Sequence, residues 1–522
     1  MIWQHQYTPA GMGVSAAIAA LPIAVLLLLL GILRKPAWLA ALSGLLTAAL
    51  VAVFLYGMPI GLSVSAASYG AAFGLFPIGW IVFTAILLFN LTIETGQFEV
   101  LKRSLGALTT DRRMQALMIA FAFGAFMEGA AGFGAPVAIA ASMMVALGFE
   151  SFYAAGICLL ANTAPVAFGS IGIPLTTLAT VTGLPLARLS QDVGRICAPV
   201  SLILPAYLVL VMSGWRGLKG MLGAALGCGA AFATTQFVVS NFIGPELTDI
   251  LSSLAAIAAL VVAERLSGRK RSVSGIDPAA MFKAWAPYGL LVVFVLLWGF
   301  KPVQGQLAHA TVAFPWPGLH NLIQRMPPVS AKPALYPAIY SFNSLAASGT
   351  ACLFAVICSA LVLRVSLRAF AGVLAKTFRQ LFVAEATIAM VLALAFLMNY
   401  SGATATLGLA FAATGAAFPF FSALLGWLGV FLTGSDTSSN ALFGNLQAVT
   451  ANRLGMDPIL MAAANSSGGV MGKMISLTSI AVAAAATGMK QGEDGKLFRF
   501  TLRHSIALAV TIGIITWIYS RM

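Results

Sequence analysis

One glycine-rich segment occurs twice in this chain, and the duplication constrains the fold more than any other feature. The first copy, GAFMEGAAGFGAP, runs from Gly124 to Pro136, and the second, GVFLTGSDTSSNA, runs from Gly429 to Ala441. Two glycines and a phenylalanine coincide at an offset of 305 positions. Both copies interrupt long apolar stretches, which is typical of the discontinuous helices that form the binding sites of secondary transporters.

Two further windows repeat at nearly the same spacing. ANTAPVAFG at 161–169 corresponds to ANSSGGVMG at 464–472 with an offset of 303, and LTIETG at 91–96 corresponds to LMNYSG at 397–402 with an offset of 306. Three windows at one approximate offset indicate an internal duplication of a large part of the chain.

The charges around the third window predict the orientation of the two copies. The segment after Gly96 carries four basic residues, whereas the segment after Gly402 has no charge until Asp436. Because lysine and arginine mark cytoplasmic loops, the two segments should lie on opposite sides of a membrane. The sequence therefore predicts repeats of inverted topology.

Composition places the chain in a membrane. It is 60% hydrophobic and 8% charged, whereas soluble domains have roughly 25% charged residues. With about 20 apolar residues per span, we expect an all-α polytopic protein of about 12–14 membrane segments, including re-entrant or broken helices. The net charge of +14 is better explained by basic residues that set topology than by nucleic-acid binding, and the N-terminus should be outside.

The predicted organisation has four parts. They are N-terminal helices at 1–69; a first repeat at 70–213 with broken segments at 124–136 and 161–174; connecting helices at 214–376, with a basic cytoplasmic linker at 265–277 and a proline-rich outside loop at 301–337; and a second repeat at 377–522 with broken segments at 429–441 and 464–478.

Glu128 is the main candidate for proton coupling in the first repeat. It is surrounded by glycines and followed by Pro136, residues that weaken a helix and free backbone groups. An ionisable residue at such a break is a candidate functional residue by default. The alternative is that the glycines only allow close helix packing and that Glu128 is merely paired.

The second repeat has a more polar break, from Thr433 to Asn440. Free amides and hydroxyls at the start of a half-helix can bind an anion. Asp436 is a second proton-coupling candidate. Lys473 lies in an otherwise uncharged segment, where it can neutralise a substrate carboxylate, pair with Asp436, or extend to the membrane interface.

Asparagine and hydroxyl residues recur at the second break of each half. Asn162 and Thr163 correspond to Asn465 and Ser466. An asparagine amide can donate to a carboxylate and accept from a hydroxyl, and a small hydroxy acid has both groups. Glu94 and Glu385 lie near predicted helix ends and are expected to be boundary residues, whereas His504 lies at the cytoplasmic edge of the last predicted helix, where a histidine can respond to pH.

Several long motifs resemble the bacterial lactate permease family, which includes L-lactate and glycolate permeases. They are GAFMEGAAGFGAPVAIA, NTAPVAFGSIGIP, NFIGPEL, RMPPV, NYSG, WLGVFLTGSDTSSNALFG and GKMIS. The resemblance covers nearly the whole chain and implies proton-coupled uptake of short 2-hydroxymonocarboxylates across the bacterial inner membrane. It also implies two inverted repeats, each with a re-entrant hairpin and a broken helix.

Matching these motifs to the chemistry above gives one predicted site. The predicted substrate-binding residues are Gly129, Gly132, Phe133, Gly134, Asn162, Thr163, Ser435, Thr437, Ser438, Ser439, Asn440, Asn465, Ser466 and Lys473, and the predicted proton-coupling residues are Glu128 and Asp436. No cofactor or metal is expected, and membrane lipid is the expected surrounding.

Three other functions compete with a proton symporter. Sodium coupling is compatible with unwound backbone beside Ser, Thr and Asp, and a carboxylate channel could use the same breaks as a pore. An enzyme is disfavoured because the sequence has no P-loop, HExxH or GxSxG motif. The five cysteines form no CxxC pair and indicate nothing about the redox compartment. The sequence does not indicate an oligomeric state.

Overall fold

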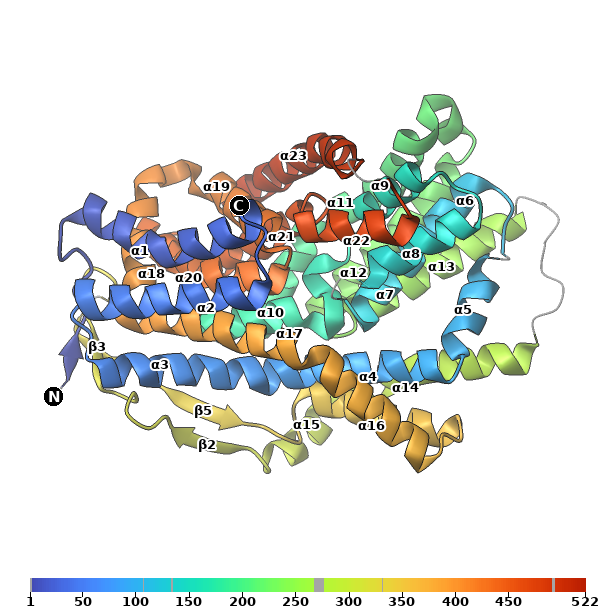
Figure 1. The fold of residues 1–522 in the computed structure, drawn as a ribbon. Coiled ribbons are helices and arrows are strands. Elements are labelled where there is room, and N and C mark those ends of the chain that lie inside the picture. Colours follow the sequence, from blue (N-terminus) through green and yellow to red (C-terminus); the bar gives the residue numbers. More distant parts are fainter. Residues whose placement is uncertain (1, 107, 133–134, 267–276, 331, 491–492) are drawn as a thin grey trace.

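The computed structural model describes residues 2–522 except 107, 133–134, 267–276, 331 and 491–492. Helices dominate the described chain, with short strands gathered at one edge (Figure 1). The N-terminal part comprises β1 (Trp3–Gln4), α1 (Met12–Leu27), η1 (Leu28–Ile32), α2 (Ala37–Leu50), η2 (Val51–Leu55), α3 (Ile60–Phe73), η3 (Gly74–Gly79), α4 (Trp80–Glu94) and α5 (Gln97–Gly106).

The first broken segments follow. Their elements are α6 (Arg112–Ala116), η4 (Leu117–Phe123), α7 (Gly124–Ala130), α8 (Ala135–Ala146), α9 (Ser151–Ala161), η5 (Val166–Phe168), α10 (Gly169–Thr182) and the long α11 (Leu186–Lys219). The connecting part comprises α12 (Leu222–Phe242), α13 (Thr248–Leu266), α14 (Pro278–Gly299), α15 (Lys301–Ala308), β2 (Val312–Pro315), β3 (Ile323–Arg325), β4 (Ala334–Leu335), β5 (Ile339–Phe342) and α16 (Ser348–Val362).

The last part contains the second pair of breaks. Its elements are α17 (Leu367–Ser401), α18 (Ala403–Phe411), η6 (Ala412–Ala417), α19 (Phe418–Thr433), α20 (Asp436–Leu454), α21 (Pro458–Lys473), α22 (Leu477–Thr487) and α23 (Asp494–Tyr519). The predicted basic linker at 265–277 lies mostly outside the described residues.

The all-α polytopic class is confirmed. Within the described residues, 10 helices are long and apolar enough to cross a membrane, or up to 11 if the pair Ser151–Ala161 and Val166–Thr182, bent by 64°, forms one span. Two shorter apolar helices, Pro136–Ala146 and Ser348–Val362, add to them. The predicted total of 12–14 segments is reached only when such short pieces are counted, because each break divides an apolar stretch into helices too short to span alone.

The distribution of polarity also fits a bilayer. Large apolar side chains are exposed on the outside, including Phe54 at 81% and Leu367 at 88%. The interior, in contrast, contains fully buried polar residues such as Asn440 and Ser466. Polar groups inside and apolar groups outside are what a hydrocarbon solvent requires.

Two pairs of glycines at equivalent positions of the two halves have similar backbone geometry. Gly96 and Gly402 end α4 and α17 with φ values of 71° and 88°, and Gly183 and Gly488 end α10 and α22 with 71° and 66°. The apolar helical segments that precede Gly96 and Gly402 are Ile60–Glu94 and Leu367–Ser401, and both have 35 residues. The next helices, α5 and α18, lie at opposite ends of the molecule (Figure 1), as an inverted repeat requires.

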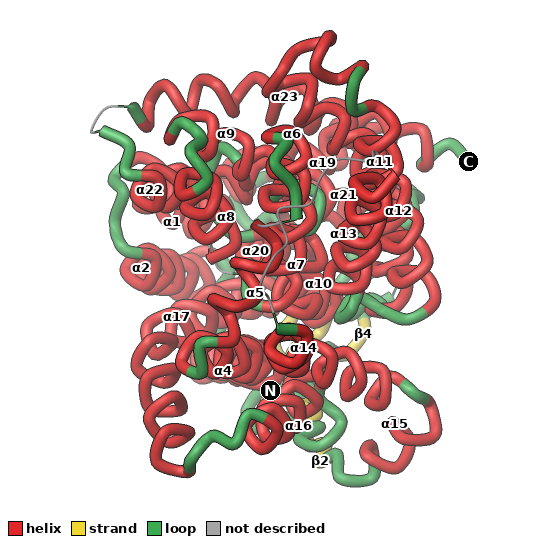
Figure 2. Tube along the Cα trace, turned by 90° about the vertical axis from the view of Figure 1, so that its right-hand side faces the viewer, coloured by secondary structure: helices red, strands yellow, loops and turns green. Residues whose placement is uncertain are grey.

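Helices of the two halves pack against each other at the centre. α10 of the first half contacts α20, and α22 of the second half contacts α8 and α9. Figure 2 shows α7, α10 and α20 near the middle of the molecule. This crossing brings the broken segments of both halves together.

The N-terminal segment and the proline-rich loop at 301–337, which were both predicted to be outside, lie on one face of the molecule. β1, near the N-terminus, pairs in parallel with β3, which pairs with β4. Both β3 and β4 belong to the proline-rich loop at 301–337. The N-terminal segment and this loop must therefore lie on the same side of the membrane.

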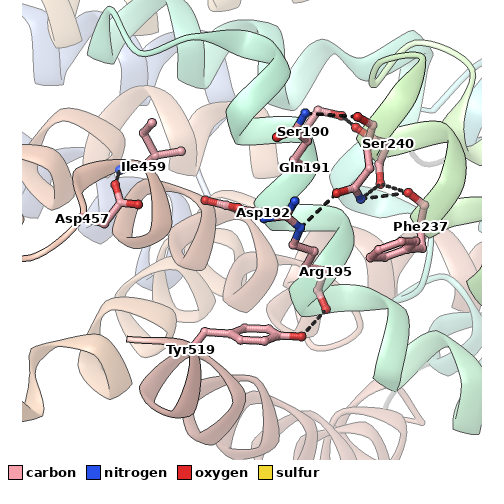
Figure 3. A network of polar contacts seen from close by, with 10 residues as sticks. Ser190, Gln191, Asp192, Arg195, Phe237, Ser240, Asp457, Ile459 and Tyr519 are labelled. Atoms are coloured by element: carbon pink, nitrogen blue, oxygen red, sulfur yellow. Dashed lines mark hydrogen bonds and ion pairs between the residues drawn. The ribbon is translucent and has the colours of Figure 1, made fainter. Parts of the chain in front are cut away.

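A network of polar contacts joins α11 to its neighbours (Figure 3). Arg195 of α11 forms an ion pair with Asp192 at 3.3 Å and donates from Nε to Asn241 Oδ1 of α12 at 3.0 Å. The Tyr519 hydroxyl of α23 donates to the Arg195 carbonyl at 3.4 Å. These contacts join three helices and explain Arg195 as a structural residue.

Glycines allow α19 and α21 to lie in close contact. Gly468 faces the Ala423 backbone, where an added Cβ would overlap the carbonyl oxygen. We expect Gly468→Val to reduce the yield of folded protein, because overpacking typically costs 1–3 kcal/mol. Gly495→Val is the control, since nothing lies within 4 Å of an added Cβ there. Equal monodisperse yields of both variants in size-exclusion chromatography would contradict this packing account.

Candidate functional site

The broken segments of the two halves surround a cavity of about 350 Å³, within the usual 300–1,000 Å³ range of small-molecule sites. Its lining comes from α7, the α9–α10 break, the start of α20, the end of α21 and α22, with one residue from α2. The lining residues are Ala37, Glu128, Val166, Gly169, Ser170, Ile173, Pro174, Gly434, Ser435, Asp436, Thr437, Lys473, Thr478, Ser479 and Val482.

Glu128 occupies the first-half side of the cavity. It lies in the short helix α7 and is only 4% exposed. Its Oε2 accepts a hydrogen bond from Asn162 Nδ2 at 2.9 Å. Gly169 leaves room for the carboxyl, since a Cβ added there would lie 2.9 Å from Glu128 Oε1. Glu128 is thus held between both breaks of its repeat.

An unusual backbone run forms the wall beside Glu128. Ser170, Ile171 and Gly172 have φ values of 47°, 59° and 75°, a left-handed conformation that costs roughly 1–2 kcal/mol for each non-glycine residue. The Ser170 hydroxyl donates to the Ala131 carbonyl at 3.1 Å. This bond joins the first break to the second and helps hold the strained turn at the cavity.

The second-half side is the N-terminus of α20. Gly434 turns the chain with φ 73°, and the Ser435 side chain caps α20 by accepting from the Ser438 amide at 3.2 Å. Asp436 and Thr437 follow in the first turn and line the cavity. Unpaired amides and the positive end of the helix dipole favour an anion at this position.

Asp436 is buried in a network of amides and hydroxyls. Its Oδ2 accepts from Ser466 Oγ at 2.5 Å and from Asn440 Nδ2 at 3.2 Å. Its Oδ1 has no hydrogen-bond partner within the described structure. Behind it, Asn465 Nδ2 donates to Asn440 Oδ1 at 2.9 Å, and Gln447 Nε2 donates to Asn465 Oδ1 at 3.0 Å. The network fixes one face of the carboxyl and leaves the other oxygen available.

Lys473 supplies the positive charge of the cavity. It is 8% exposed and donates from Nζ to the Gly434 carbonyl at 2.8 Å. It interacts electrostatically with both Glu128 and Asp436. Within the described residues it forms no ion pair with either carboxyl at 4.0 Å or less. The suggested Asp436–Lys473 pairing is therefore a through-space interaction and not a direct salt bridge.

The predicted site residues fall into two groups. Glu128, Ser435, Asp436, Thr437 and Lys473 line the cavity. The others that are described do not line it: Gly129, Gly132, Asn162, Thr163, Ser438, Ser439, Asn440, Asn465 and Ser466. Of these, Asn162, Asn440 and Ser466 hold the two carboxyls from behind. Phe133 and Gly134 lie outside the described residues.

Other lining residues were not singled out from the sequence. Ser170 and Pro174 belong to the GSIGIP run that the family resemblance included, so the motif already contained them. Thr478 and Ser479 belong to a hydroxyl cluster after Lys473, where Ser476 caps α22. Ala37 comes from α2, and no sequence signal connects it with the breaks.

Three titratable residues lie away from the cavity. Glu94 forms an exposed ion pair with Lys376, and His504 contacts the Tyr207 hydroxyl. Glu385 lines a separate, largely aromatic pocket of about 450 Å³ between η3, α4 and α17.

Comparison with known proteins gives a consistent result. Residues 15–522 match the L-lactate permease family. The chain is 44% identical to glycolate permease GlcA of Escherichia coli K12, covering 98% of this chain and 97% of the other. It is 44% identical to the L-lactate permease of Bacillus subtilis strain 168, covering 99% and 98%, and 42% identical to that of Escherichia coli K12, with the same coverage.

Proposed function

The chain belongs to the L-lactate permease family, and from this premise we propose that it is a secondary active symporter. Its substrate is L-lactate, glycolate or a similar short 2-hydroxymonocarboxylate, imported with a proton across the bacterial cytoplasmic membrane. The observation that carries the proposal is the charge content of the cavity: one buried lysine and two buried carboxyls are its charged lining residues within the described structure.

The cavity has suitable groups for each part of such a substrate. Lys473 and the free amides at the start of α20 bind the carboxylate. The Asp436 carboxyl and nearby hydroxyls can accept from or donate to the 2-hydroxyl group. Val166, Ile173 and Val482 form the apolar surface against which the methyl group of lactate, or the methylene group of glycolate, can lie.

Charge balance explains why a proton would accompany the anion. With one of Glu128 and Asp436 protonated, the remaining carboxylate and Lys473 make the empty cavity neutral. An entering carboxylate adds one negative charge to a buried site, where an unpaired charge is strongly disfavoured. Protonation of the second carboxyl restores neutrality. One proton per anion follows from this count.

The membrane potential gives a second reason for proton coupling. A lone anion that enters a cell with an inside-negative potential loses roughly 2.3 kcal/mol per 100 mV. A proton carried on the same protein cancels this charge. A symporter that moves one proton with each anion transports no net charge, whereas anion flux through a carboxylate channel would follow the membrane potential.

The proposal is tested by uptake of labelled L-lactate and glycolate into proteoliposomes, with pH and sodium gradients varied independently. We expect saturable uptake driven by an acidic exterior in the absence of sodium. Uptake that requires a sodium gradient would assign sodium as the coupling ion. Non-saturable flux without countertransport would indicate a channel.

We propose that the two halves form an inverted repeat that alternates access to this cavity. The prediction is that α5 and α18 are reached by reagents from opposite sides of the membrane. Glu99 and Ala413 are exposed on and just after these helices, so Glu99→Cys and Ala413→Cys, made in a Cys358→Ser background, provide the labelling sites. A membrane-impermeant maleimide should label only Ala413→Cys in intact cells. Labelling of both positions from one side would contradict the inverted arrangement.

A further inference from the structure

Asp249 is a third buried carboxyl, and the cavity lining does not include it. It lies in the first turn of α13, directly after the NFIGPEL motif, and is 0% exposed. Neither of its carboxyl oxygens has a hydrogen-bond partner within the described residues. Glu246, three residues earlier, in contrast accepts from Ser348 Oγ at 3.3 Å.

Asp249 adjoins the break that carries Glu128. α13 packs against α7 and η4, and a Cβ added to Gly129 would lie 2.8 Å from Asp249 Cβ. The two carboxyls interact electrostatically. Gly129 is therefore small because Asp249 occupies the space beside it.

The surroundings of Asp249 contain few other titratable groups. α13 also contacts α10 and α12. η4 and α10 have no titratable side chain, and α12 contributes only Cys228. Cys197 of α11 is a further buried thiol, which burial keeps protonated. Within the described residues, no Lys, Arg or His nitrogen forms an ion pair with an Asp249 carboxyl oxygen at 4.0 Å or less.

A buried carboxylate without a cation or hydrogen-bond donor is strongly disfavoured, and two adjacent carboxyls cannot both ionise. We propose that Asp249 and Glu128 form a proton-holding pair, in which Asp249 is a second coupling residue. This inference rests on the proposed proton symport. With Asp436 protonated, the pair holds one proton when the cavity is empty, so that its remaining carboxylate balances Lys473. It takes a second proton from water when the anion binds, and it releases that proton when the anion leaves.

The test compares Asp249→Asn with wild type in proteoliposomes. Asparagine resembles protonated aspartate in shape but removes the second titrating group, so Glu128 would titrate alone. The half-maximal pH of uptake should move to higher pH by about 0.3 unit, because a carboxyl that titrates alone takes up its proton at a higher pH than the second protonation of two equal, coupled carboxyls. Ser253→Ala is the control, since Ser253 is equally buried on α13 and, within the described residues, its hydroxyl bonds only to the Ile250 carbonyl. A midpoint in Asp249→Asn that is unchanged or moves to lower pH would overturn the proposal.

Infrared spectroscopy of the purified protein gives a second readout that does not require transport. With ¹³C-labelled aspartate in an Asp436→Asn background, which removes the other buried cavity aspartate, the protein should show a protonated aspartate carbonyl band at neutral pH that is lost when Asp249 is also replaced by Asn. If this variant does not fold, Asp249→Glu should move the band from the aspartate to the glutamate region. Absence of any protonated aspartate band in the Asp436→Asn background would reject the pair. Presence of this band together with no pH-driven uptake by the wild-type protein would instead contradict the proposed symport.

Discussion

Replacing Glu128 with Gln is expected to reduce pH-driven uptake of lactate to background while the protein remains folded. The substitution removes the titratable group but keeps the size of the side chain. In the wild-type structure Asn162 Nδ2 donates to Glu128 Oε2 at 2.9 Å, and the glutamine amide oxygen can accept the same hydrogen bond. Gly169 provides the same space for the amide. The proton-carrying step is lost, whereas the structure around it is retained.

Exchange transport separates this coupling role from a structural role. Exchange of internal for external lactate needs no net proton movement, so Glu128→Gln should retain it. Glu99→Gln is the control, because Glu99 is exposed and pairs only with Lys102 at 2.8 Å. The assignment fails if Glu128→Gln takes up lactate at the wild-type rate with an unchanged pH profile, or if exchange is lost together with uptake in a well-folded protein.

Replacing Lys473 with Met is expected to weaken lactate binding by about 30-fold or more. Removing one partner of a buried, hydrogen-bonded charge pair typically costs 2–5 kcal/mol, and each 1.4 kcal/mol is a factor of ten. Methionine keeps most of the side-chain volume and removes only the ammonium group that faces the cavity. Binding can be measured with purified protein by lactate-dependent thermal stabilisation, with Lys496→Met, an exposed position on α23, as the control.

The double variant Asp436→Asn with Lys473→Met distinguishes two roles of the lysine. If Lys473 served mainly to neutralise Asp436, the double variant would recover expression and binding. Lys473 donates to the Gly434 carbonyl and forms no direct salt bridge with Asp436. We therefore expect the double variant to be expressed better than either single variant but not to recover lactate binding. Wild-type lactate affinity in a folded Lys473→Met protein would show that the lysine does not bind the substrate.

The sequence can predict breaks of this kind because they depend on local chemistry. Glycine clusters and the polar run at Ser435–Asn440 cannot continue an apolar helix, so their positions follow from residue type. The duplication then indicated that breaks of both halves belong together. For the same reason Glu128, Asp436 and Lys473, the few charges at these breaks, could be assigned to the cavity before their geometry was known.

The roles of the asparagines could not be derived in the same way. Asn162, Asn440 and Asn465 are predicted to contact substrate; in the structure they do not line the cavity and bind carboxyls, carbonyls and each other. Spacing along a helix shows which residues share a face, but it does not show whether that face meets the cavity or a neighbouring helix. Asp249 was missed because it has no counterpart in the repeat, and only its burial beside Gly129 reveals it.

Proton movement during lactate entry tests the central claim most directly. Proteoliposomes without sodium would contain a pH-sensitive dye, with the membrane potential clamped by potassium and valinomycin. One proton entering with each lactate predicts that lactate addition acidifies the interior in a one-to-one ratio and that the initial rate does not depend on the sign of the potential. Lactate entry without acidification, or entry that follows the potential, would contradict proton-coupled symport by this protein.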